Sequence, residues 1–149
     1  APRVQYAALC WRPSGRSALD GVQILLITSR DTGRWVIPKG WPMPGLTPDA
    51  AAAREAWEEA GVSGQPLAQP IGSYAYDKGI GVERLPLPCR VDVYPLQVDD
   101  LANRFPERKQ RRRKWFSPEK AARKVAEPEL QALLAAFVAP DASRVVAAG

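Results

Sequence analysis

The chain has 149 residues, 46% of them hydrophobic, and a net charge of +5, which predicts a single domain, residues 1–149, that buries a real core. No apolar run reaches the roughly 18 residues that a membrane span needs, and no signal-peptide pattern opens the sequence. We therefore expect a cytoplasmic protein with no membrane partner. Two cysteines offer no disulfide framework, and the absence of histidine excludes histidine-based catalysis and argues against zinc.

Before the middle of the chain, the pattern predicts strands joined by turns. Residues 4–11 and 22–28 are apolar runs, and the Pro, Ser, Gly and Asp residues between them are typical of a hairpin loop. The second run is nearly continuous and rich in branched residues, which predicts a strand buried on both faces. A turn at residues 29–33 leads to a short strand at residues 35–37.

A Pro- and Gly-rich loop then leads into a helix whose two ends are clearly marked. Thr47 is the expected N-cap, Pro48 occupies the first helical position, and Gly61 falls where a left-handed C-terminal cap belongs. The side of the helix that we expect to be buried carries Ala50, Ala53, Trp57 and Ala60.

The other side of this helix carries three carboxylates, those of Glu55, Glu58 and Glu59, at spacing i, i+3, i+4. Glutamate-rich faces are common on solvated helices, and Arg54 can offset the charge through an i, i+4 pair with Glu58. The helix alone therefore leaves a structural explanation open. A strand, a Gly/Pro loop and an acidic helix together favour a Mg²⁺ site, because Mg²⁺ typically joins a few carboxylates to substrate phosphates.

After this helix the pattern predicts a linker at residues 63–70, strands at 71–76 and 89–96, and a loop or ragged hairpin at 77–88. A polar, irregular stretch follows at 99–110, and a short last strand at 114–116. Helices are expected to start at Ser117 and Glu127. The second carries an amphipathic stripe expected to pack in the core, made of Leu130, Leu133, Leu134, Phe137 and Val138. Residues 140–149 are expected to form a loosely ordered tail. The sheet and helices together indicate an α/β or α+β sandwich.

A basic and aromatic segment, FPERKQRRRKWF at residues 105–116, supplies much of the excess positive charge. Such a run is typical of a solvated surface or a nucleic-acid patch. It also suits a small, densely phosphorylated ligand, because arginine donates forked hydrogen bonds and lysine provides a point charge.

Residues 40–62 resemble the signature of the Nudix hydrolases. The match at the family's spacing comprises Gly40, Arg54, Glu55, Ala56, Glu58, Glu59, Gly61 and Val62. The first glutamate of the signature is replaced by Leu46, so Arg54 needs a partner other than the one it has in the family. The resemblance implies an α/β fold, the Nudix α/β/α sandwich with a mixed β-sheet, one catalytic helix and a C-terminal helix.

A closer resemblance, to the diphosphoinositol polyphosphate and diadenosine polyphosphate phosphohydrolases, covers most of residues 23–137. It rests on the segments WVIPKG, AAAREAWEEAGV, GSYAYDKG, VDVYPLQV, FPERKQRRRKWFSPEKA and EPEL. The implied substrates are polyphosphorylated small molecules, and the implied cofactor is Mg²⁺, with Mn²⁺ as an alternative.

The resemblance also implies roles for individual residues. The metal ligands are expected to be Glu55, Glu58, Glu59 and the backbone carbonyl of Gly40, and the catalytic residues Glu58, Glu59 and Arg54. The phosphate-binding residues are expected to be Arg30, Lys39, Arg111, Arg112, Arg113 and Lys114. The candidates for an additional base are Glu83, Asp77 and Glu107. Trp41 and Tyr76 can stack on a base or sugar or simply pack.

Three functions remain open on the sequence alone. The first is Mg²⁺-dependent hydrolysis of phosphoanhydride bonds in diadenosine polyphosphates or diphosphoinositol polyphosphates. The second is removal of pyrophosphate from RNA 5′ ends or hydrolysis of another nucleoside-diphosphate derivative, with the basic segment attracting the strand. The third is a noncatalytic binding or regulatory module, suggested by Leu46. The sequence leaves monomer and dimer equally open.

Overall fold

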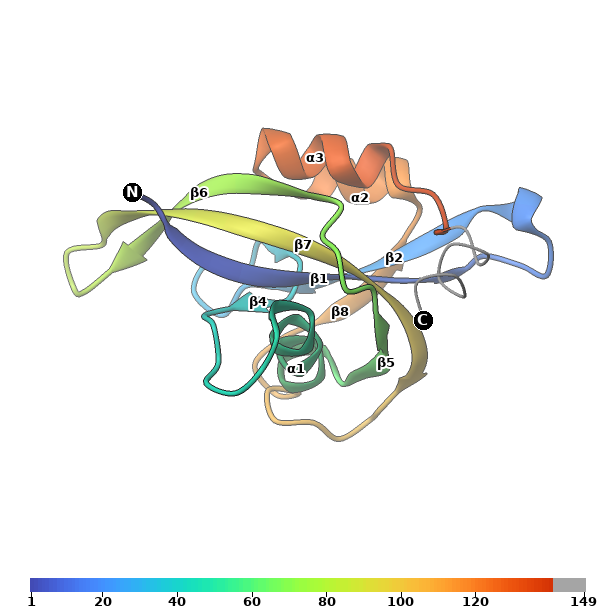
Figure 1. Ribbon diagram of the computed structural model, residues 1–149, viewed down its shortest axis with the longest axis horizontal. Coiled ribbons are helices and arrows are strands. Elements are labelled where there is room, and N and C mark those ends of the chain that lie inside the picture. The colour runs from blue at the N-terminus through green and yellow to red at the C-terminus, as the bar shows by residue number, and fades with distance from the viewer. Residues whose placement is uncertain (141–149) are drawn as a thin grey trace.

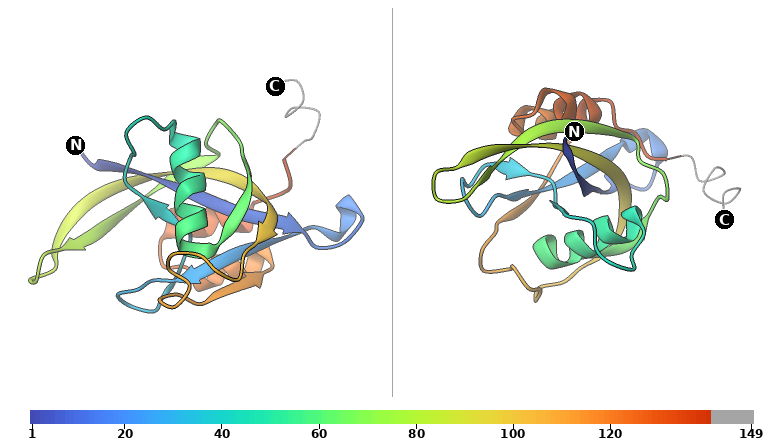
Figure 2. Two further views of the ribbon diagram at one scale, coloured as in Figure 1. Left: turned by 90° about the horizontal axis from the view of Figure 1, so that it is seen from below. Right: turned by 60° about the vertical axis from the view of Figure 1, so that its left-hand side comes forward.

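The computed structural model describes residues 1–140, which form one curved mixed sheet with helices on both faces (Figure 1). Figure 2 shows the first helix on one side of the sheet and the two C-terminal helices on the other. The expected α/β/α sandwich is therefore confirmed. The expectation of a loosely ordered tail falls almost wholly on residues 141–149, which lie outside the described residues. No helix of the described part is long and apolar enough to cross a membrane.

The sheet has eight strands. They are β1 (Arg3–Pro13), β2 (Val22–Thr28), β3 (Trp35–Val36), β4 (Lys39–Gly40), β5 (Val62–Pro66), β6 (Gly72–Ile80), β7 (Leu85–Leu101) and β8 (Arg113–Phe116). The helices are α1 (Pro48–Ala60), α2 (Pro118–Lys124) and α3 (Pro128–Ala135), and a 3₁₀ turn spans Ala18–Asp20.

The main path of the sheet runs β3-β2-β1-β7-β5, while β4 pairs with β1, β6 with β7 and β8 with β2. The central pair, β1 and β7, is parallel, with a register from Arg3 opposite Cys89 to Trp11 opposite Gln97. The other pairs are antiparallel. Because helices cover both faces, β1 and β2 are apolar on both sides, as the continuous run at residues 22–28 predicted.

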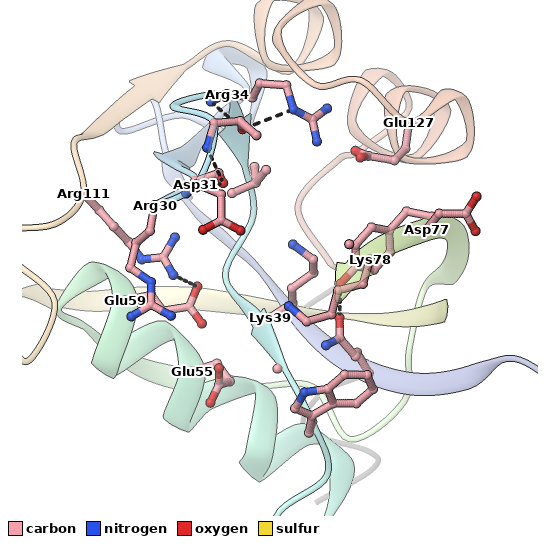
Figure 3. Close-up of a pocket in the computed structure, with 18 of the residues that line it drawn as sticks. Arg30, Asp31, Arg34, Lys39, Glu55, Glu59, Asp77, Lys78, Arg111 and Glu127 are labelled. Atoms are coloured by element: carbon pink, nitrogen blue, oxygen red, sulfur yellow. Dashed lines mark hydrogen bonds and ion pairs between the residues drawn. The ribbon is translucent and has the colours of Figure 1, made fainter. Parts of the chain in front are cut away.

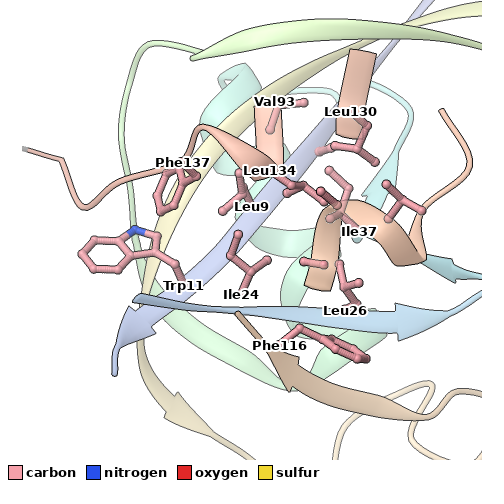
Figure 4. Close-up of a cluster of buried hydrophobic side chains, with 14 of the residues drawn as sticks. Leu9, Trp11, Ile24, Leu26, Ile37, Val93, Phe116, Leu130, Leu134 and Phe137 are labelled. Carbon is pink, nitrogen blue, oxygen red and sulfur yellow. The ribbon is translucent and has the colours of Figure 1, made fainter. Parts of the chain in front are cut away.

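Two hydrophobic cores occupy the two faces of the sheet, and neighbouring residues of one strand enter different cores. Leu9 belongs to the core beneath α2 and α3 (Figure 4), and Cys10 to the core beneath α1. Both Cys10 and Cys89 are free and buried. The first core includes Ile24, Leu26, Ile37, Leu130, Leu134 and Phe137, and the second includes Leu25, Ile27, Ala52, Ala56 and Leu96.

The ends of α1 agree with the sequence prediction. Thr47 is the N-cap, and Gly61 adopts a left-handed backbone with φ 70°. The expected buried side was wrong in part, because Ala50, Ala53 and Trp57 are only partly buried. The residues of α1 that are fully covered are Ala51, Ala52, Ala56, Glu59 and Ala60. The helix is therefore rotated so that one of its carboxylates faces the protein.

Two further expectations about local structure were wrong. Residues 63–70 are not only a linker, because β5 pairs with β7 there. Gly64 permits this pairing, since a Cβ atom at that position would collide with the carbonyl oxygen of Gln97. Val138 was assigned to the core but is 76% exposed, because α3 ends at Ala135 and Phe137 closes the core.

Candidate functional site

A cavity of about 450 Å³ opens beside α1 and gathers residues from distant parts of the chain (Figure 3). The loop after β2, strand β4, helix α1, strand β6, the loop before β8 and the start of α3 all contribute to its wall. The charged residues of the lining are Arg30, Asp31, Arg34, Lys39, Glu55, Glu59, Asp77, Lys78, Arg84, Glu107, Arg111 and Glu127.

Glu55 and Glu59, one helical turn apart on α1, place their carboxyl groups together in this cavity. Glu59 is 6% exposed, and burial, followed by a hydrogen bond to Glu55, raises the pKa of Glu59 to about 9. Burial also raises the pKa of Glu55. A hydrogen bond between two carboxyl groups requires a proton on one of them, and these shifts place it on Glu59. In the absence of a cation, Glu59 therefore keeps this proton near neutral pH.

Gly40 lies directly against the carboxyl group of Glu55. A Cβ atom at position 40 would collide with both carboxyl oxygens of Glu55. This close approach explains why the loop before α1 needs glycine here, and it brings the backbone of β4 to the acidic pair. Tyr6 and Ala7 of β1 hold β4 in place through antiparallel pairing.

Arg111 joins the acidic pair to the loop before β8. Its guanidinium lies 3.5 Å from Glu59 Oε1, donates to Glu107 Oε1 at 2.8 Å, and donates to the carbonyl oxygen of Thr28 at 3.0 Å. Arg30 lies on the solvent side of this network, with its Nε 3.6 Å from Glu107 Oε1. Arg111 is therefore committed to holding carboxylates in position, whereas Arg30 is exposed to an incoming ligand.

Lys39 reaches the cavity from the opposite side (Figure 3). Its ammonium group lies 5.0 Å from the centre of the Tyr76 ring, and the Tyr76 hydroxyl donates to Gln5 at 2.6 Å. Burial lowers the pKa of Lys39, although the negative field of Glu59 and Glu127 opposes that shift. Lys39 and Arg30 thus present positive charge from the two sides of the acidic pair.

Several residues expected in the site lie elsewhere. Glu58 does not line the cavity, and its carboxylate pairs with Arg54 at 3.2 Å on the surface. This i, i+4 pair supplies Arg54 with the partner that Leu46 cannot provide. Glu83 is exposed near the tip of the β6–β7 hairpin and is not part of the lining, whereas Asp77 and Glu107 are.

The residues of the basic segment that follow Arg111 lie outside the cavity, each in a different place. Arg112 stacks on Trp35, with its guanidinium 5.7 Å from the ring centre, and Arg113 donates to the carbonyl oxygen of Ala60 at the C-terminal end of α1. Lys114 lies beside a different cavity. None of the three lines the cavity with Arg111, which corrects the expectation of one shared phosphate site. Alternation along the chain turns Arg112 and Lys114 to the face opposite that of Arg113, and Arg113 is held at the end of α1 by its hydrogen bond.

Some residues of the cavity were missed by sequence reasoning. Glu127 was assigned only as the start of the last helix, yet its position as N-cap of α3 brings it into the lining. Gln5, Lys78 and Arg84 also contribute. No local motif marks these residues, because they enter the site through strand pairing and helix docking rather than through spacing in the sequence.

The chemistry of the donor set fits a hard divalent cation. Within residues 1–140 no three carboxylates form a ready-made cation site. However, two carboxyl groups that share a proton in a polar cavity are a place where a divalent cation can replace that proton. The acidic pair and the backbone of Gly40 supply oxygen atoms, and the lining contains no cysteine or histidine to favour zinc.

Replacing Gly40 with alanine is expected to weaken the cation dependence of any activity without unfolding the protein. The added methyl group must displace the carboxyl group of Glu55, which moves one proposed ligand. We expect the cation concentration for half-maximal activity to rise about tenfold or more. A titration with Mg²⁺ checks this, with Ser14→Ala, an exposed change outside this cavity, as a control. An unchanged Mg²⁺ requirement in Gly40→Ala would contradict the assignment.

Comparison with known proteins agrees with this architecture. A family model described as the NUDIX domain matches residues 2–137, so the chain belongs to the Nudix domain family. It is 34% identical over 110 residues to Nudix hydrolase 12, mitochondrial, of Arabidopsis thaliana, a match that covers 72% of this chain and 54% of that protein. It is 32% identical over 117 residues to diphosphoinositol polyphosphate phosphohydrolase 3-alpha of Mus musculus, covering 77% and 64%.

The chain thus spans between 54% and 64% of the length of these two relatives. Among solved structures, a C. elegans Ap4A hydrolase superposes with a TM-score of 0.64 at 20% identity, covering 91% of this chain and 95% of that one. This likeness shows a shared fold. The resemblance to the diphosphoinositol polyphosphate phosphohydrolases, drawn from the sequence motifs, is confirmed by the match to the mouse protein.

Proposed function

We propose that this protein hydrolyses phosphoanhydride bonds of polyphosphorylated small molecules with the help of a divalent cation, Mg²⁺ or Mn²⁺. The observation that carries the proposal is the buried pair of Glu55 and Glu59, faced by the cationic groups of Arg30 and Lys39 across one cavity. Carboxylates alone would repel a polyphosphate, and cations alone would only bind it. The combination suits a reaction that needs both phosphate binding and activation of water.

The cation would be held by Glu55, Glu59 and the backbone carbonyl of Gly40, with Glu58 as a further proposed ligand that pairs with Arg54 in this structure. When bound, it neutralises phosphate oxygens and makes the attacking water a stronger acid. The oxygen of that water attacks phosphorus, and the bond from phosphorus to the bridging oxygen breaks, so that the leaving phosphate departs with the bonding electron pair.

The side chains divide the remaining work. Arg30 and Lys39 bind phosphate oxygens and thereby orient the chain of phosphates. Arg111 positions Glu59 and Glu107 rather than the substrate, because its bonds are already made to them. Glu107 accepts from Arg111, whereas Asp77 forms no ion pair among residues 1–140 and lines the cavity. Figure 3 draws Asp77 on the opposite side of Lys39 from the acidic pair, whereas Glu107 shares Arg111 with Glu59. We therefore assign the proton from water to Glu107.

The substrate class follows from the size and charge of the cavity. At about 450 Å³ it accommodates a small molecule, and its cationic side chains suit several phosphates. Relatives named for diphosphoinositol polyphosphates support the same class. Trp41 also lines the cavity, and since the Arg3 guanidinium lies 5.1 Å from its ring centre on one face, the other face is the one we propose for a nucleobase. Diadenosine polyphosphates and diphosphoinositol polyphosphates are therefore the proposed substrates.

A hydrolysis panel with product identification tests this proposal. Diadenosine pentaphosphate, a diphosphoinositol polyphosphate, a nucleotide sugar and 5′-triphosphorylated RNA are each incubated with the protein and Mg²⁺, or with a chelator. We expect cation-dependent cleavage of the first two. Faster cleavage of the RNA, with steep salt dependence, would favour the RNA 5′-end alternative. Binding of these ligands without any cation-dependent turnover would favour the noncatalytic module.

A further inference from the structure

A second cavity, of about 580 Å³, lies where β8 meets α2. We call it the β8–α2 pocket, and it is lined by Gln23, Lys114, Trp115, Phe116, Ser117, Lys120, Arg123 and Lys124. Figure 1 shows β8 running from the α1 side of the sheet toward α2. No lining residue is shared with the cavity at α1. Four of the lining side chains are cationic and none is a carboxylate.

The packing of β8 and α2 brings the cationic side chains of this pocket together. The ammonium groups of Lys114 and Lys124 lie 5.5 and 6.0 Å from the centre of the same ring, that of Phe116, which is buried in the core. Ala121 and Ala122 bury the inner face of α2, which fixes the direction in which the helix presents its lysines. The like charges are therefore gathered before any ligand arrives, and an anion relieves their mutual repulsion.

The four cationic side chains of the β8–α2 pocket are also accessible to a ligand. None of Lys114, Lys120, Arg123 and Lys124 forms an ion pair with a carboxylate in the part of the chain that the structure describes. Glu119, the neighbouring acid on α2, does not line the pocket. In the cavity at α1, by contrast, Arg111 is held by Glu59 and Glu107.

The kind of anion follows from the other side chains. Arg12 covers one face of Trp115, with its guanidinium 4.0 Å from the ring centre, and Trp115 also packs against the second core. Since Phe116 is buried, the lining leaves little aromatic surface for a nucleobase. Lysine ammonium groups act as point charges for phosphate, and the volume suits a small molecule. We propose that the β8–α2 pocket is a second anion site, which binds a small molecule bearing several phosphates. It lacks carboxylates to hold a cation, so it binds this ligand without cleaving it.

Calorimetric titration of the whole chain with inorganic tripolyphosphate, without divalent cation, tests the proposal. Lys120→Glu with Lys124→Glu is expected to weaken binding about tenfold or more at this site, because two attractive charges become repulsive. The control, Arg16→Glu with Arg104→Glu, makes the same change of net charge at exposed positions outside both cavities and should bind as the unaltered chain does. The milder Lys120→Gln with Lys124→Gln serves if the first variant fails to fold.

Three results would overturn the proposal. Equal loss in the control variant would show general attraction to a basic surface. Loss in Arg30→Ala, with retention in the Lys120/Lys124 variants, would place the binding in the cavity at α1. Tighter binding of a single-stranded oligonucleotide with as many phosphates would show that the pocket serves nucleic acid instead. Hydrolysis of the preferred substrate, measured in parallel, should be unchanged in the Lys120/Lys124 variants, which separates this proposal from the proposed function.

Discussion

Glu59→Gln is expected to lower turnover about a hundredfold or more while leaving the protein folded. The amide keeps the shape of the buried side chain but cannot serve as a charged ligand beside Glu55. Glu119→Gln, an exposed change on α2, provides the control and should leave turnover unaltered. Measurement of steady-state rates over a range of Mg²⁺ concentrations checks this. Full activity in both Glu58→Gln and Glu59→Gln would remove the basis for the proposed function.

Glu59→Gln is expected to stabilise the cation-free protein at alkaline pH, although it lowers turnover. In the cation-free protein the Glu59 carboxyl holds its proton until about pH 9, whereas in the unfolded chain it releases the proton near its ordinary value of 4.5. The unfolded state therefore binds fewer protons between these two pH values, and the free energy of unfolding falls as pH rises across this window. Glu59→Gln removes this dependence. We expect the variant to melt at a higher temperature than the unaltered chain at pH 8 without cation, and scanning calorimetry at pH 5 and pH 8 measures the difference.

Arg111→Met is expected to destabilise the protein by about 3 kcal/mol and to abolish most activity. The methionine leaves Glu59 and Glu107 without their shared cation, and the carbonyl oxygen of Thr28 loses a donor. Arg108→Met, at an exposed position in the same loop, removes the same charge and should have little effect. Urea denaturation gives the free energy of unfolding of both variants.

A double substitution measures how strongly Arg111 and Glu59 depend on each other for stability. If Arg111 acts mainly through its contact with Glu59, the change in the free energy of unfolding of Arg111→Met with Glu59→Gln should differ from the sum of the two single changes. Strict additivity would show that Arg111 acts independently of Glu59. Both Arg111 variants are expected to lose activity, because the acidic pair and Glu107 are no longer held in place.

The acidic helix could be located from the sequence because its signals are local. Thr47, Pro48 and Gly61 mark its ends by backbone chemistry that depends on few neighbours. Spacing along the helix then placed Glu55 and Glu59 together. The strands at residues 4–11 and 22–28 were predictable for a similar reason, since continuous apolar runs are required wherever both faces of a sheet are covered. The resemblance to a known family added the sandwich and the expected substrate class.

Only the tertiary structure decided which charges meet. Arg112, Arg113 and Lys114 follow Arg111 directly, yet Arg112 reaches Trp35, Arg113 the end of α1 and Lys114 the β8–α2 pocket. Glu127, remote in the sequence, enters the cavity because α3 docks beside it.

The sequence by itself therefore determined the acidic helix, the main strands and the excess of positive charge. The structure determined how that charge is divided between two cavities. Helix spacing and caps depend on neighbouring residues, whereas the composition of a cavity depends on strand register and helix docking, which join residues far apart in the chain.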